Sequence, residues 1–240
     1  MAVDTLATLL DAAARSCAVA AQSSWLTATN ATALQLKALM FETAEEMLER
    51  VDWPECTIDQ TIAGTDTDVY ALASDFTRIA GDADTAVLET TPSRRSVTPV
   101  NSNVEWTNMV EAGASGAQRH YRLIGVRSIQ FYRDLEAAAE VVVPYVSNKW
   151  ICAADGTTTK STFTVATDFP LIPGHLLRDG TIWRFKRDKG LAYLDRQNDY
   201  ELRLARAANR SRSQGVIDMA RGSMRGRMSK PTLPDTLPSA

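Results

Sequence analysis

The stretch Val51-Asp52-Trp53-Pro54 separates two regions of the sequence that differ in hydrophobic periodicity. Before it, apolar residues recur at the three- and four-residue spacing of an amphipathic helix. After it, short alternating or β-branched segments are separated by glycine, asparagine, aspartate and proline. Because a proline disfavours the helical conformation of the preceding residue, we predict that a helix ends here and a β-rich region begins.

Two helices are predicted before this stretch. The first has Asp4 as its candidate N-cap and carries a stripe rich in small residues, which permits close packing. The second begins at Thr32-Ala-Leu-Gln35, which is typical of a capping box, and continues through Glu49 with a wide apolar face. The stripe of the first helix consists of Leu6, Leu9, Leu10, Ala13, Cys17 and Ala20.

The region between Trp53 and Phe169 is predicted to form short strands and one short helix. The helix covers Asn101–Ala112 and ends at Gly113. Several short strands of this kind favour an antiparallel sheet or a small sandwich. The predicted strands are Thr57–Ile62, Val69–Leu72, Ala86–Thr90, His120–Val126, Ser128–Tyr132, Val141–Val146 and Thr162–Ala166.

Helical periodicity returns after Asp168-Phe-Pro-Leu-Ile-Pro173. Pro173 lies near the first turn of the next helix, where a missing N–H costs least, and this helix ends at Gly190. A last helix begins at about Leu194. The residues predicted to pack in the core, or between neighbouring subunits, are Leu9, Leu10, Leu36, Met40, Met47, Trp183, Tyr200 and Leu204.

The predicted fold class is α+β: a four-helix bundle interrupted by an inserted antiparallel β-rich domain, with an extended C-terminal tail. The helical bundle domain covers residues 1–52 and 169–212, the inserted domain 53–168 and the tail 213–240. The tail is rich in Ser, Arg, Gly and Met and then in Pro, so it cannot bury enough surface to fold alone. The rest has an ordinary globular composition, with 45% hydrophobic residues in the whole chain.

Charge is distributed unevenly along the chain. Residues 1–167 contain 12 Lys/Arg against 21 Asp/Glu, a net −9, and residues 168–240 contain 14 against 8, a net +6. This basic end indicates an acidic partner, either nucleic acid or an acidic protein surface; a solvated helix face is the alternative. Trp183-Arg-Phe-Lys-Arg187 also interleaves aromatic and basic residues. The favoured interpretation places Trp183 in the core and Arg184, Lys186 and Arg187 outside.

The sequence predicts no catalytic, cofactor-binding or metal site, and we expect no enzyme. The cysteines form no CxxC pair, and His120 and His175 lie in different segments. No nucleophile elbow, Walker loop or dinucleotide fingerprint occurs, and the carboxylates of Glu42–Glu49 are expected to form a solvated helix face. No signal peptide or apolar membrane span is predicted, so we expect synthesis in a cytoplasm.

The order of these features resembles the head-to-tail adaptor family of tailed bacteriophages that includes the tail tubular protein A group. The resemblance covers most of residues 5–210. It rests on the alanine-rich first helix, the second helix ending at Asp52-Trp53, Tyr70–Ile79, Gly125–Arg133, Val141–Trp150, Asp168-Phe-Pro-Leu-Ile-Pro173-Gly-His-Leu-Leu, Ile182–Tyr193 and Tyr200-Glu201.

The resemblance implies a structural virion protein that forms a homo-oligomeric ring of about 12 copies. Such a ring joins the portal protein to the tail nozzle or tail tube protein and continues the DNA channel used in genome ejection. Genomic DNA passes through the lumen without specific binding, and no membrane or cofactor is involved. The expected location is the head-tail junction of the virion, after assembly in the host cytoplasm.

The C-terminal tail is the segment expected to bind the portal. Its methionines are adaptable apolar groups that alternate with arginines, so it could become ordered on docking into a groove. The alternative function is a non-specific nucleic-acid-binding protein that uses the basic C-terminal third. The predicted portal-binding residues are Ile217, Met219, Arg221, Met224, Arg225, Arg227 and Met228.

Overall fold

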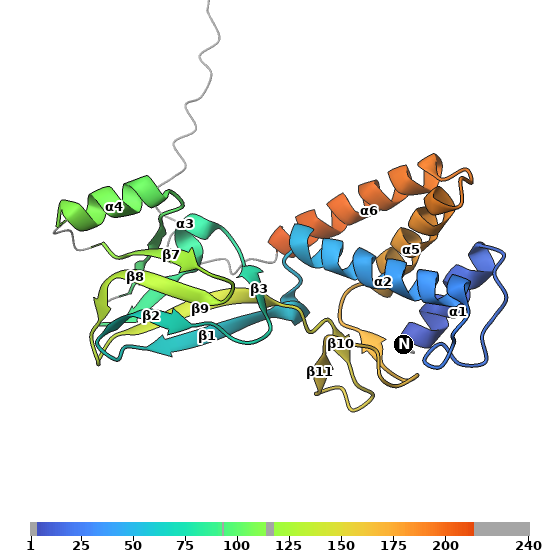
Figure 1. Ribbon diagram of the computed structural model, residues 1–240, viewed down its shortest axis with the longest axis horizontal. Coiled ribbons are helices and arrows are strands. Elements are labelled where there is room, and N and C mark those ends of the chain that lie inside the picture. Colours follow the sequence, from blue (N-terminus) through green and yellow to red (C-terminus); the bar gives the residue numbers. More distant parts are fainter. Residues whose placement is uncertain (1–3, 93, 114–117, 214–240) are drawn as a thin grey trace, which may run out of the picture.

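The computed structural model describes residues 4–92, 94–113 and 118–213 and shows a mixed α+β protein with two hydrophobic cores (Figure 1). One core lies among helices near the two ends of this range. The other lies between β-sheets formed by the intervening segment. We call these the helical part and the sheet part, and they lie at opposite ends of an elongated molecule (Figure 1). The α+β class is confirmed, and residues 214–240 of the predicted tail lie outside the described residues.

The helical part contains α1 (Leu6–Ser16), α2 (Ala31–Arg50), α5 (Gly174–Asp188) and α6 (Leu194–Ser213). Helix α5 is central, because α1, α2 and α6 all contact it. Consequently the middle of α5 is buried on nearly every side, from Leu176 to Phe185. All the predicted packing residues lie in this core and are at most 6% exposed: Leu9, Leu10, Leu36, Met40, Met47, Trp183, Tyr200 and Leu204.

The N-caps of α1 and α2 differ from those predicted. Thr5, not Asp4, caps α1, because its side chain accepts a hydrogen bond from the backbone N–H of Thr8 at 3.2 Å. Asn30 caps α2 by accepting from the backbone N–H of Ala33 at 2.7 Å. The predicted capping box was wrong because Thr32 already lies inside the first turn of α2, where its backbone is helical.

Arg184 is buried, whereas the sequence predicted that it points outward. It is only 4% exposed, its guanidinium forms an ion pair with Glu46 of α2, and its Nη1 donates to Thr43 Oγ1 at 3.1 Å. The rings of Trp183 and Tyr200 lie 4.5 and 5.9 Å from it. A buried guanidinium stays charged, so it is stable only when a carboxylate and hydrogen-bond acceptors surround it.

The sheet part contains two main sheets that share one core. In the first, the strand order is β1-β9-β4-β5, and β3 also pairs with β9; in the second, the order is β2-β8-β7-β6. The pairs are antiparallel except β6–β7, which is parallel and was not predicted. The strands are β1 (Thr57–Ala63), β2 (Thr67–Ala71), β3 (Phe76–Ile79), β4 (Leu88–Thr91), β5 (Arg95–Ser96), β6 (Thr98–Pro99), β7 (His120–Ile124), β8 (Ser128–Leu135) and β9 (Glu140–Ser147).

Burial along the strands follows the pleat. Every second side chain of β9, from Val141 to Tyr145, is buried against Ile129 and Phe131 of β8. The connections of this part contain η1 (Pro54–Cys56), α3 (Ala83–Ala86) and α4 (Asn103–Glu111). Helix α4 corresponds to the predicted helix, and Gly113 follows it with a positive φ of 57°.

The chain returns to the helical core before residue 168, the predicted end of the inserted domain. A small third sheet, with the order β11-β10-β12, consists of β10 (Ile151–Cys152), β11 (Thr159–Lys160) and β12 (Phe169–Pro170). Ile151 and the preceding Trp150 belong to the helical core, as do Trp53 and Cys56.

The predicted strand Thr162–Ala166 was wrong, because this segment folds around the Asp168 carboxylate. Asp168 Oδ2 accepts hydrogen bonds from the backbone N–H groups of Thr164 and Val165 at 3.0 and 2.9 Å. Backbone donors used in this way are not available to a strand ladder.

A joint formed by Arg78 holds the two parts together. Arg78, on β3, donates from Nε and Nη2 to the carbonyl oxygen of Leu48 at 3.1 and 2.9 Å, and its Nη1 lies 2.6 Å from Asp52 Oδ1. Leu48 lies in the last turn of α2, whose carbonyls lack partners within the helix. The backbone N–H of Gly81 donates to the same Asp52 carboxylate. The sheet part is therefore fixed to the C-terminal end of α2.

We expect Gly180→Ala to destabilise the protein, although this change normally stabilises a helix interior by about 1 kcal/mol. A Cβ atom at Gly180 would lie 2.3 Å from Thr43 Cγ2 and 3.0 Å from Tyr200 Cε2, so the substitution overpacks the contact between α5 and α2. The free energy of unfolding should fall by about 1–3 kcal/mol in a denaturant titration. Adding Thr43→Ser, which removes Cγ2 and keeps the hydroxyl, should recover part of this loss. Unchanged stability of Gly180→Ala would contradict the close approach.

Candidate functional site

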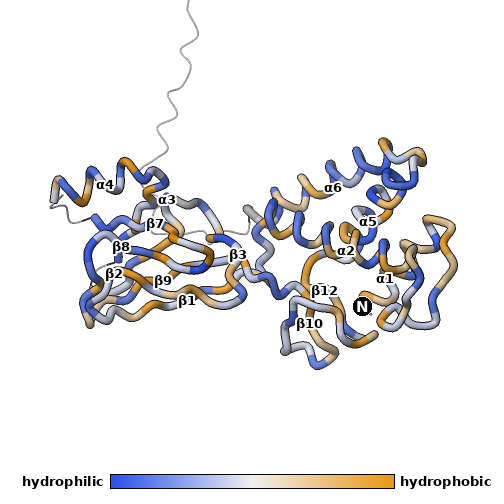
Figure 2. The backbone as a smooth tube through the Cα atoms, in the orientation of Figure 1, coloured by the Kyte–Doolittle hydropathy of each residue, from blue (hydrophilic) through white to orange (hydrophobic). Residues whose placement is uncertain are grey.

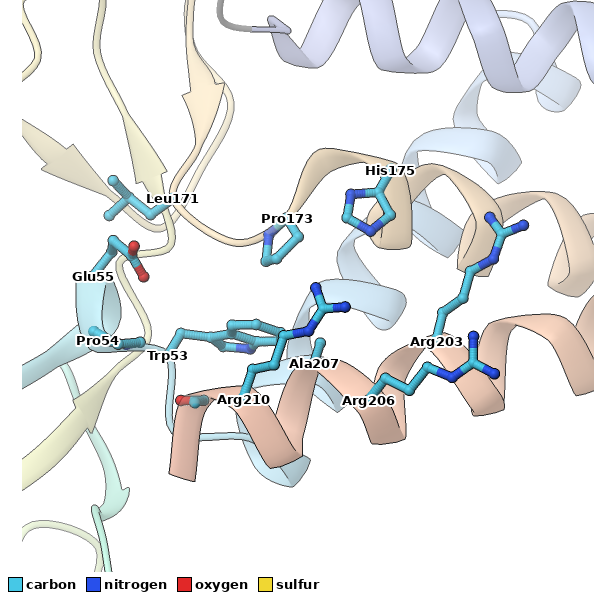
Figure 3. A pocket seen from close by; sticks show the side chains of 11 residues that line it. Trp53, Pro54, Glu55, Leu171, Pro173, His175, Arg203, Arg206, Ala207 and Arg210 are labelled. Carbon is cyan, nitrogen blue, oxygen red and sulfur yellow. The ribbon is translucent and has the colours of Figure 1, made fainter. Parts of the chain in front are cut away.

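A cleft of about 390 Å³ lies beside the joint, between α6, the start of α5 and the turn that leads into β1 (Figure 3). Three arginines of α6 form one side, and His175, in the first turn of α5, lies on another (Figure 3). We call this site the basic cleft. Its lining residues are Trp53, Pro54, Glu55, Leu171, Pro173, His175, Arg203, Arg206, Ala207, Arg210 and Ser211.

The arginines lie on one face of α6 because Arg203, Arg206 and Arg210 are spaced at i, i+3 and i+7. The neighbouring face carries Tyr200 and Leu204, which are buried against α5. Figure 2 shows the resulting alternation of hydrophobic and hydrophilic residues along α6. The same helix therefore packs in the core with one face and presents positive charge with the next.

Hydrogen bonds fix the base of the cleft. The indole of Trp53 is 5% exposed, and its Nε1 donates to the carbonyl oxygen of Met47 at 3.0 Å. At the end of α6, the Ser211 hydroxyl donates to the carbonyl oxygen of Asp52. The base of the cleft and the end of α6 are thus both held by hydrogen bonds at the segment that connects α2 to β1.

The arginines differ in how far their charge is already neutralised. Arg203 Nη1 lies 2.7 Å from Asp179 Oδ2, and Asp179 is also paired with Arg178. Arg206 is exposed and has no ion-pair partner in the described part of the chain. Glu55 brings one carboxylate into the cleft. The cleft therefore keeps a positive charge, and guanidinium groups bind carboxylates and phosphates in a bidentate manner.

The thiols of this protein are poor nucleophiles. Burial raises the pKa of the Cys17 and Cys152 thiols, and it raises the pKa of Cys56 to about 12. A thiolate is the reactive form, so these shifts suppress reactivity near neutral pH. In the described ranges, no group of three or more His, Cys, Asp or Glu side chains is placed to hold a metal ion. The cleft is thus suited to binding an anionic group, and none of these cysteines lines it.

The structure places the remaining sequence-predicted residues as follows. His120 is half-buried on β7, whereas His175 is exposed in the cleft. Glu46, expected on a solvated face, is the counter-charge of Arg184. The packing residues come together in the helical core, and the predicted portal-binding residues, Ile217–Met228, lie outside the described residues.

Neither the basic cleft nor the joint was predicted from the sequence. The arginine spacing along residues 203–210 could have revealed a common face. No local pattern could have shown that Trp53 and His175 lie against that face, because they come from distant segments. The role of Arg78 likewise depends on the position of β3 beside the end of α2.

No protein-family model matches the sequence, and no curated protein matches it. Within the described part of the chain, no helix combines the length and the apolar character needed to cross a membrane. Any function assigned to the chain therefore depends on its own residues and on the order of its elements.

We expect Cys56 to be unreactive toward a thiol reagent in the native protein at pH 8. With a pKa of about 12, roughly 10⁻⁴ of its thiol is ionised at this pH, and the side chain is buried. Cys17, which is half-buried, should react first, and unfolding in denaturant should release Cys56 and Cys152. The measurement is reagent uptake over time followed by mapping of the labelled residues. Rapid labelling of Cys56 in the folded protein would show that this site is more open than described.

Proposed function

We propose that this chain is a structural head-to-tail adaptor, or connector, of a tailed bacteriophage. In this proposal, about 12 copies form a ring that joins the portal to the tail nozzle or tail tube and continues the DNA channel. The observation that supports it most is the order of the elements. The helices α1, α2, α5 and α6 share one core, and the sheet part is inserted between α2 and α5, as the sequence resemblance implies.

We further propose that these helices act as a four-helix bundle domain and form the inner framework of each subunit. The side chains predicted to pack in the core or between subunits, such as Leu36 and Met47, are fully covered within one chain. Contacts between subunits therefore have to use other, exposed surfaces. The side chains of the cleft also support a structural role, because they offer cations, and no cysteine lines the cleft.

The proposed portal-binding segment continues directly from α6. Helix α6 ends at Ser213, and the seven candidate residues, from Ile217 to Met228, follow 4 to 15 residues later in the sequence. Alternating methionines and arginines suit a groove that has both apolar and acidic lining. In the virion, this arrangement would place the ring at the head-tail junction with α6 directed toward the portal.

We expect removal of residues 214–240 to abolish capture of the chain by the portal ring of the same phage. The deleted segment contains all seven candidate residues, whereas the helical and sheet cores remain complete. A shorter truncation that removes only residues 231–240 is the matched control and should still bind. Binding is scored by co-sedimentation and electron microscopy, and circular dichroism checks that each truncated chain is folded. Undiminished capture of the 214–240 deletion would refute the assignment.

The alternative function, non-specific nucleic-acid binding, is favoured by the arginine stripe of α6. If it is correct, the isolated chain binds duplex DNA with a dissociation constant of about 10⁻⁴–10⁻⁶ M that weakens steeply with salt. The adaptor proposal predicts weaker binding than this, because a channel must let DNA slide. A fluorescence titration at two salt concentrations distinguishes the two, and Arg206→Glu/Arg210→Glu shows whether any binding uses the cleft.

A further inference from the structure

Helix α2 carries exposed carboxylates on the side opposite its core residues. Glu42, Glu45 and Glu49 are spaced at i, i+3 and i+7, so they form one stripe along the C-terminal half of the helix. Glu42 Oε1 lies 3.5 Å from Nε of the buried Arg184, which forms its closer ion pair with Glu46. Glu45 and Glu49 form no ion pair within the described ranges. We call Glu42, Glu45 and Glu49 the acidic stripe.

The cations beside the acidic stripe already have partners. They lie on α2 or on segments that contact its C-terminal half, and each has a carboxylate oxygen within 3.4 Å. The pairs are Arg50 with Glu46 and Glu201, Arg78 with Asp52, and Lys149 with Asp75. The charges of Glu45 and Glu49 are therefore not neutralised within the described chain.

The acidic stripe does not stabilise α2 itself. Like charges three and four residues apart on a helix repel one another. Glu49 also lies in the last turn of α2, where the helix dipole disfavours a negative charge. The stability of the free chain therefore gives no reason for three glutamates at these positions, whereas a cationic partner would relieve their repulsion.

The basic cleft carries the opposite charge at the same spacing. Arg203, Arg206 and Arg210 are also placed at i, i+3 and i+7. Together with the pocket that shares Arg203, the cleft contains five arginines and three carboxylates, a net +2. These charged residues are Glu55, Arg178, Asp179, Arg196, Asp199, Arg203, Arg206 and Arg210.

The acidic stripe and the basic cleft of one chain face different directions. Glu201 of α6 points toward α2, because its carboxylate lies 2.5 Å from the guanidinium of Arg50. At about 100° per residue, Arg206 and Arg210 lie roughly 140° and 180° around α6 from Glu201. Figure 3 shows the arginines on the side of α6 that faces His175. Any contact between the two surfaces must therefore involve two molecules.

We infer that the basic cleft of one chain receives the acidic stripe of a second copy of the same chain. This inference deepens the proposed ring and rests on it, because it names the contact between its subunits. Each stripe spans seven residues, about 10 Å at 1.5 Å per residue, so the glutamates of one helix can lie opposite the arginines of the other. Guanidinium groups bind such carboxylates in a bidentate manner.

Exposed leucines extend both surfaces. Leu34, three turns before Glu45 on α2, is 47% exposed, and Leu202, one turn before Arg206 on α6, is 58% exposed. A contact between the two helices would cover apolar surface beside the ion pairs, which favours association. Since the two surfaces differ, each added chain leaves one of each unoccupied. Such a head-to-tail contact closes into a ring when the rotation per subunit divides a full turn.

Charge disfavours the other occupants of the cleft. The chain's own residues 214–240 contain four Lys/Arg and two Asp, a net +2, so they carry the same sign as the cleft. A DNA duplex carries about one negative charge per 1.7 Å of its axis, so its phosphates would also meet Glu55, Asp179 and Asp199. Three glutamates spaced along a helix can meet the arginines without approaching all of these carboxylates.

The test exchanges the charges in the full chain. The cleft variant is Arg206→Glu/Arg210→Glu and the stripe variant is Glu45→Lys/Glu49→Lys. Sedimentation velocity over a concentration series at low salt should show association of the wild type, lost at 1 M salt, where the Debye length is about 3 Å. Each variant alone should associate at least about tenfold more weakly, because its two surfaces then carry the same sign. An equimolar mixture of the two should associate like the wild type, because each reversed surface then meets its complement.

Two controls separate a specific contact from an effect of net charge or folding. The chain with all four substitutions has the net charge of the wild type and both surfaces reversed, so it should associate like the wild type. Arg94→Glu/Arg127→Glu matches the charge change of the cleft variant at exposed positions in turns of the sheet part, and it should also associate normally. Circular dichroism checks that each variant is folded.

The contact is wrong if the wild type does not associate, or if either the cleft variant or the stripe variant associates normally. It is also wrong if neither the mixture nor the fourfold variant recovers association, or if the sheet-part control is weakened as much as the cleft variant. Loss of DNA binding in the cleft variant, with no self-association of the wild type, would instead assign the cleft to nucleic acid.

This test and the portal test fail independently. If the wild-type chains do not associate but are still captured by the portal, the contact between cleft and stripe is overturned and the adaptor proposal stands. If the chains associate through the cleft but no portal captures them, the contact stands and the adaptor proposal fails.

Discussion

The ion pair and hydrogen bonds of Arg78 determine how the two parts of this protein are arranged. Its guanidinium donates two hydrogen bonds to the carbonyl oxygen of Leu48 at the end of α2 and also forms an ion pair with Asp52. A carbonyl oxygen that lacks a partner within the helix thereby accepts hydrogen bonds from a charged side chain, and β1 starts from a fixed position. The Trp53 turn, which forms the base of the basic cleft, lies directly after Asp52. The shape of the candidate site therefore follows from this joint.

Much of the fold could be predicted because its signals are local. The ends of α5 follow from Pro173 and Gly190, and β1 and β9 follow from β-branched alternation. Arg184 could not be predicted, because its counter-charge Glu46 belongs to a helix far away in sequence. Its charge suggested exposure, and only the packing of α2 against α5 makes burial favourable.

The candidate site was less predictable than the fold. The arginine spacing on α6 is readable, but a cleft also needs walls, and these come from segments that meet only after the sheet part is in place. Charge asymmetry along the sequence is partly compensated in the fold, because Glu46 of the acidic part pairs with Arg184 of the basic part. The predicted packing residues were identified by periodicity, which reports burial and does not say whether a neighbour or the same chain provides the cover.

The pairing of Thr57 with Val146 affects the order in which the chain can assemble its native structure. Bringing α1 and α2 to α5 and α6 closes a long loop, and the entropy lost in closing a loop grows with the logarithm of its length. Once the β1–β9 ladder has formed, the ends of that loop are already adjacent, and the helices are separated by only a short effective linker. We therefore expect that weakening this ladder slows the folding of the helices, although most of the ladder lies outside their core.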